Sequence, residues 1–102
     1  MKVIKKLSSQ IEDEIGDAEK YARDAIETKD QYPELARTYY ALAGQELEHV
    51  GILHNAVTVL IEEERRNSGD PPPGMMEAYE LIHNWQMERV AKVKSLIQMA
   101  RE

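Results

Sequence analysis

Apolar residues recur at spacings of three and four along most of the chain, which is the pattern of amphipathic helices. Two breaks interrupt this pattern, one at Pro33 and one at the segment Asn67-Ser68-Gly69-Asp70-Pro71-Pro72-Pro73-Gly74. Proline suits the first turn of a new helix, and a run of prolines cannot continue a helix. The pattern therefore predicts three helices, at residues 3–29, 33–66 and 75–101, with a proline-rich loop at 67–74.

Each predicted helix carries its apolar residues on one face. They are Ile4, Leu7, Ile11, Ala18, Tyr21, Ala22 and Ala25 in the first helix; Leu35, Tyr39, Leu42, Ala43, Val50, Leu53, Val57 and Leu60 in the second; and Met76, Tyr79, Ile82, Val90, Val93 and Ile97 in the third. A chain of 102 residues fits one domain. The predicted fold is all-α, with an antiparallel helical hairpin and a third helix in a single domain over residues 1–102.

Two of these apolar faces contain a carboxylate where an apolar residue is expected. Glu14 stands three residues after Ile11 and four before Ala18, and Glu46 has the same spacing between Ala43 and Val50. His49 follows Glu46 by three residues, so both side chains lie on one side of the second helix, one turn apart.

An unpaired carboxylate in an apolar seam costs several kcal/mol or takes up a proton. A divalent cation would compensate Glu14 and Glu46, and carboxylate oxygens with an imidazole nitrogen suit iron, manganese or zinc. The simpler alternative is that each acid pairs with arginine or lysine, or lies at a wet edge. The combination of two acids on neighbouring helices with His49 favours the metal site.

The third helix contains a second Glu-x-x-His, formed by Glu80 and His83. This pair could add ligands to Glu14, Glu46 and His49 within one chain; the competing hypothesis makes His83 a core or interface histidine. The remaining histidine, His54, is expected at a solvated edge of the second helix.

Composition excludes several classes of function. The absence of cysteine rules out a disulfide framework and a thiolate zinc site, and a net charge of −6 argues against a nucleic-acid partner. No apolar run approaches the ~20 residues that span a bilayer. The basic N-terminus is not followed by the apolar stretch of a signal peptide, so we expect no membrane partner and a cytoplasmic location.

At the candidate ligands the chain resembles the ferritin-like superfamily, including the rubrerythrins and the encapsulated ferritins. Those proteins carry a glutamate followed seven residues later by tyrosine, and a Glu-x-x-His in the next helix. The matching residues here are Glu14, Tyr21, Glu46 and His49, and the resemblance covers about residues 3–66. It implies a carboxylate-bridged di-iron centre held by the two glutamates and His49, with Tyr21 close by.

A full ferritin-like bundle has four helices and twice this ligand set. Two copies of the chain related by a two-fold axis would complete it, as in the encapsulated ferritins. We therefore expect a homo-oligomer built from two-fold dimers, with a four-helix bundle formed on dimerisation. The resemblance implies ferroxidase activity, the oxidation of Fe(II) by O₂. Two alternatives stay open: a helical interaction module without metal, and a ferritin-like protein that binds metal without turnover.

Overall fold

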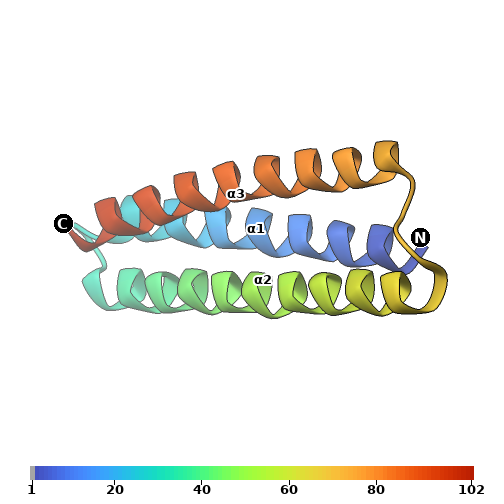
Figure 1. The fold of residues 1–102 in the computed structure, drawn as a ribbon. Helices are drawn as coiled ribbons and strands as arrows, with labels where there is room; N and C mark the ends of the chain where they lie inside the picture. The colour runs from blue at the N-terminus through green and yellow to red at the C-terminus, as the bar shows by residue number, and fades with distance from the viewer. Residues whose placement is uncertain (1) are drawn as a thin grey trace.

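The computed structural model describes residues 2–102, and this part of the chain forms three α-helices and no strand. The helices are α1 (Lys2–Thr28), α2 (Pro33–Ser68) and α3 (Pro73–Arg101). α1 and α2 form an antiparallel hairpin, and α3 lies beside α1 and runs in the same direction as α1 (Figure 1). The bundle measures 56 × 17 × 17 Å. The predicted all-α fold with three helices is confirmed. None of the described helices has a stretch long and apolar enough to cross a membrane.

Prolines and one glycine define the junctions between the helices. Pro33 stands at the start of α2, where its missing N–H would have had no partner within the helix. α2 runs to Ser68 and ends at Gly69, whose φ of 78° favours glycine. α3 begins at Pro73 for the same reason that α2 begins at Pro33. The loop predicted at 67–74 is therefore shorter in the structure, at residues 69–72.

The hydrophobic core lies along α1, which packs against both other helices, whereas α2 and α3 meet each other much less. Its buried members are Ile11, Ile15, Ala18 and Ala22 of α1, Ala43 and Val50 of α2, and Val90 and Val93 of α3. The alanines allow the helix backbones to approach closely. Ile15 lies beside the predicted apolar face yet is fully buried. Because α1 is covered on two flanks, its buried surface is wider than one stripe.

One flank of the α1–α2 hairpin faces away from α3. Ser8 and Gly16 mark the flank of α1 that faces α3: Gln86 donates a hydrogen bond to Ser8, and Arg89 lies 4.0 Å from where a Gly16 side chain would begin. Glu14 precedes Gly16 by two residues, which places it about 200° away around the helix. We call the flank on which it lies the open face. The open face consists of Leu7, Glu14 and Tyr21 of α1 and Leu42, Glu46, His49 and Leu53 of α2, none of them fully buried.

Candidate metal centre

The three predicted ligands meet on the open face, where the middle of α1 lies beside the middle of α2. Nδ1 of His49 is 3.3 Å from Oε2 of Glu14 and 3.9 Å from Oε2 of Glu46. One potential ligand atom from each residue lies within 4.8 Å of the other two. Among residues 2–102, no other three histidine or acidic side chains come together in this way. The one-turn spacing of Glu46 and His49 and the antiparallel hairpin together produce the cluster.

The cluster is half-buried rather than enclosed. The side chains of Glu46, Glu14 and His49 are 18%, 28% and 53% exposed. The sequence predicted acids inside an apolar seam, whereas in the single chain they lie at the edge of that seam. The reason is the position of α3, which packs on the opposite flank of α1. Water therefore reaches the cluster from one side.

The pKa shifts of the two carboxyl groups are those of a pair that shares one proton in the metal-free protein. The hydrogen bond with Glu14, helped by partial burial and by the negative charge of Glu14, raises the pKa of Glu46 to about 7. The same hydrogen bond lowers the pKa of Glu14, and nearby His49 lowers it further. A protonated Glu46 can thus donate a hydrogen bond to the Glu14 carboxylate. A cation bound here would replace this proton.

The donor set fits a transition-metal ion in kind and in spacing. Ligand atoms bound to one ion at about 2.0–2.2 Å lie within about 4.4 Å of each other. The three ligand atoms here all lie within 4.8 Å of one another, so binding one ion needs only small side-chain rotations. Two carboxylates and one imidazole are suitable for iron, manganese and zinc. Three protein ligands do not fill the coordination sphere of any of these ions. The cluster is therefore suited to an open site or to part of a larger one.

Tyr21 lies on the open face two helical turns after Glu14. Its ring stacks on Tyr39, with centroids 6.3 Å apart and an interplanar angle of 23°. Side chains on a helix lean toward its N-terminus, so Tyr21 leans toward Glu14. Tyr39 stands seven residues before Glu46, and because α2 is antiparallel to α1, both tyrosines lie toward the same end of the hairpin. The tyrosine pair borders the cluster toward the end of the hairpin at which α1 joins α2.

Glu80 and His83 do not join the cluster, since neither belongs to the group formed by Glu14, Glu46 and His49. His83 is exposed in the single chain, and its ring contacts His54 with centroids 4.9 Å apart.

The prediction that His54 is a solvated edge residue is wrong. His54 is half-buried, and its Nε2 lies 3.2 Å from Oε1 of Gln86. Burial also lowers the pKa of His54. The partners of His54 lie on α3, and spacing within α2 carries no signal of a contact with another helix, so this contact is not predictable from the sequence.

No family model matches the chain, and neither a curated protein nor a solved structure matches it.

Proposed function

We propose that this chain is a ferritin-like iron-binding protein in which Glu14, Glu46 and His49 form a di-iron site between two copies. The observation that carries the proposal is the meeting of two carboxylates and one imidazole, from two helices, on the face that α3 leaves uncovered. A covered and complete site requires further ligands. The open face of a second copy would supply another Glu14, Glu46 and His49.

The seven-residue spacing of the open-face side chains supports pairing of two hairpins about a two-fold axis. Leu7, Glu14 and Tyr21 repeat at intervals of seven along α1, and Leu42 and His49 repeat likewise along α2. Such spacing keeps side chains in register along a helix–helix seam. Two hairpins packed face to face would make four antiparallel helices and bring together two copies each of Glu14, Glu46 and His49. This is the number of ligands in a di-iron four-helix bundle.

Iron enters the proposed reaction as the substrate. Two Fe(II) ions give one electron each to one O₂, the oxidant, which takes up two protons from water and leaves as hydrogen peroxide. The hard carboxylate oxygens of Glu14 and Glu46 favour the Fe(III) product. The imidazole of His49 adds a neutral donor, which leaves the net charge of the site low. Glu46 loses its shared proton when iron is loaded, so uptake weakens as the pH falls.

Iron loading of matched variants tests the site. Wild type, Glu46→Ala and Glu48→Ala are loaded with Fe(II) without oxygen, and bound iron is measured after gel filtration. Glu48 is an exposed acid on the opposite side of α2, so its variant removes the same charge without touching the cluster. We expect wild-type loading for Glu48→Ala and loss of iron for Glu46→Ala. Equal iron in both variants would refute the site.

Assembly and turnover are measured on the same samples. Light scattering should show an even-numbered oligomer for iron-loaded wild type, and a monomer would refute the shared site. After admission of air, Fe(III) absorbance should rise faster than in buffer for wild type and at the buffer rate for His49→Ala. If wild type binds iron but oxidises it only at the buffer rate, the site binds metal without turnover. If wild type binds no iron, the helical interaction module is favoured.

A further inference from the structure

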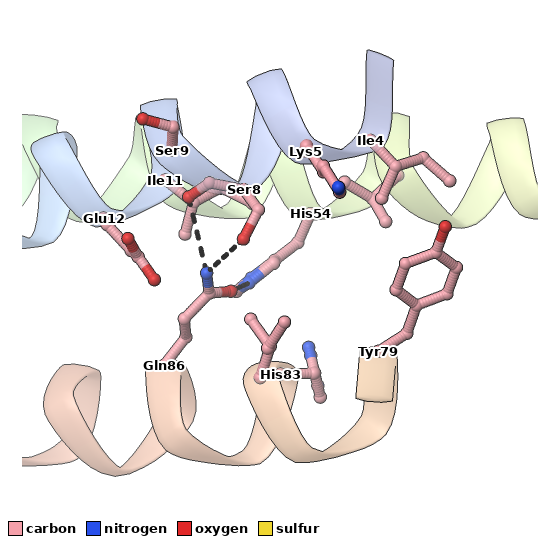
Figure 2. A pocket seen from close by; sticks show the side chains of 12 residues that line it. Ile4, Lys5, Ser8, Ser9, Ile11, Glu12, His54, Tyr79, His83 and Gln86 are labelled. Atoms are coloured by element: carbon pink, nitrogen blue, oxygen red, sulfur yellow. Dashed lines mark hydrogen bonds between the residues drawn. The ribbon is translucent and has the colours of Figure 1, made fainter. Parts of the chain in front are cut away.

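A second group of metal-ligating side chains lies between α2 and α3, outside the centre formed by Glu14, Glu46 and His49. His54 and His83 approach each other edge to face, with ring centroids 4.9 Å apart and an interplanar angle of 65°. Both residues line a cavity of about 200 Å³ between the three helices. Gln86 lies beside His54 there (Figure 2). His54 and His83 also line a neighbouring hollow that contains Glu80.

The hydrogen bonds around Gln86 determine which nitrogen of His54 carries its proton. The Gln86 amide nitrogen donates to the backbone carbonyl of Ser8 at 3.4 Å and to its hydroxyl at 3.0 Å (Figure 2). A carbonyl can only accept, so the amide oxygen of Gln86 must face His54. That oxygen is also only an acceptor, so Nε2 of His54 carries the hydrogen and donates it. In the neutral ring, Nδ1 is then the nitrogen with the free electron pair.

This arrangement is typical of a histidine that is prepared to bind metal. Metal-binding histidines commonly donate the other ring N–H to a protein oxygen, which fixes the tautomer and the ring orientation. Here the oxygen belongs to Gln86, which is only 2% exposed and is itself held by Ser8. Burial lowers the pKa of His54, as does the nearby His83, and both outweigh the opposing effect of the Gln86 hydrogen bond; this favours the neutral ring that metal binding requires.

The separation of the rings agrees with shared coordination. A nitrogen-bound ion lies about 2.0–2.1 Å from the nitrogen and so about 3.2 Å from the ring centre; two imidazoles on one tetrahedral ion then have centres about 5 Å apart. The measured separation is 4.9 Å. We propose that His54 and His83 together bind a divalent transition-metal ion of the zinc, cobalt and copper class. Water completes the coordination, and the carboxylate of Glu80 adds negative charge to the same hollow.

This site is independent of the proposed iron centre. His54 follows His49 by five residues, which turns it about 140° around α2, away from the open face. An ion there would join α2 to α3, the two helices that meet least in the bundle. Zinc is therefore expected to stabilise the packing of α3 on the hairpin.

Side-chain NMR can test the proposal because the chain has only 3 histidines, and each site contains its own. Zn²⁺ is titrated into wild type, His83→Gln and His49→Gln, with the imidazole signals assigned from these variants. We expect the His54 and His83 signals to shift together in wild type and equally in His49→Gln. In His83→Gln the zinc-induced shift of His54 should be lost. His83 is exposed, so this variant is expected to fold normally.

Two outcomes would overturn the proposal: a His54 signal that zinc leaves unchanged in wild type, or an equal zinc-induced shift of His54 in His83→Gln. The His49 signal reports the other site in the same spectra. Failure of the His54–His83 site is therefore distinguishable from failure of the iron centre.

Discussion

Replacing Glu46 with glutamine isolates the effect of the proton that this carboxyl group holds in the metal-free protein. Glutamine has the shape of a neutral carboxylic acid, and its amide can still donate to the Glu14 carboxylate. It cannot ionise, so it removes the repulsion that develops when both Glu14 and Glu46 are charged. We expect Glu46→Gln to stabilise the metal-free protein above neutral pH and to abolish iron loading.

The size of the effect follows from the pKa of Glu46, which hydrogen bonding with Glu14 raises from an ordinary 4.5 to about 7. At 1.36 kcal/mol per pKa unit, this change has a ceiling of roughly 3.4 kcal/mol. Water reaches the cluster from one side and screens the charges, so we expect about 1–2 kcal/mol. The folded state binds the proton more tightly than the unfolded chain. The stabilisation that protonated Glu46 contributes is therefore complete below about pH 4.5 and is lost as the pH rises through about 7.

Urea unfolding in the presence of a chelator, at one protein concentration and at several pH values from 5 to about 9, measures this contribution. His54 has the opposite dependence: its lowered pKa means that stability is lost as the pH falls below about 6.5. Glu46→Gln retains His54, so the contribution of His54 to the free energy of unfolding cancels in the difference between the variant and wild type. This difference should be small at pH 5 and reach about 1–2 kcal/mol above pH 8. For a domain of this size, that corresponds to a rise of roughly 4–16 °C in Tm.

Glu48→Gln is the matched control, because it removes one negative charge from an exposed position on the same helix. It corrects for the general benefit of reducing a net charge of −6. A pH-independent difference between Glu46→Gln and wild type, or the same pH profile for both variants, would refute the shared proton.

Three further substitutions test other parts of the structure. Ile15→Ala should cost about 2–5 kcal/mol in the free energy of unfolding because Ile15 is fully buried, whereas Ile52→Ala, at a position 68% exposed, should change it by less than about 0.5 kcal/mol in the same urea assay. Gln86→Leu should cost about 1–3 kcal/mol, since it leaves His54 and Ser8 without their partner, and should alter the ¹⁵N shifts of the His54 ring by releasing its tautomer. Gly69→Ala should lower Tm because φ is 78° there, whereas Gly74→Ala, without a positive φ, should not be strained in this way.

Helix number and position were predictable from sequence because apolar periodicity and prolines report on local structure. The ends were less predictable, since Pro73 opens α3 rather than belonging to the loop before it. The proximity of Glu14 to Glu46 and His49 was also predictable from the sequence. Two of these residues share one helix at a spacing of three, and the third fills the equivalent gap in the adjoining helix.

The exposure of the cluster and the surroundings of His54 were not predictable, and both depend on one tertiary choice. The motif of Glu80 and His83 establishes that these residues are one turn apart on α3, but not which flank of the hairpin α3 covers. On the open face, α3 would have enclosed Glu14 and Glu46 within one chain. Packed on the opposite flank, it brings His83 to His54 instead and leaves the proposed iron ligands only half-buried. The same docking of α3 thus brings the two imidazoles of His54 and His83 together and leaves Glu14, Glu46 and His49 uncovered, as the proposed pairing with another copy requires.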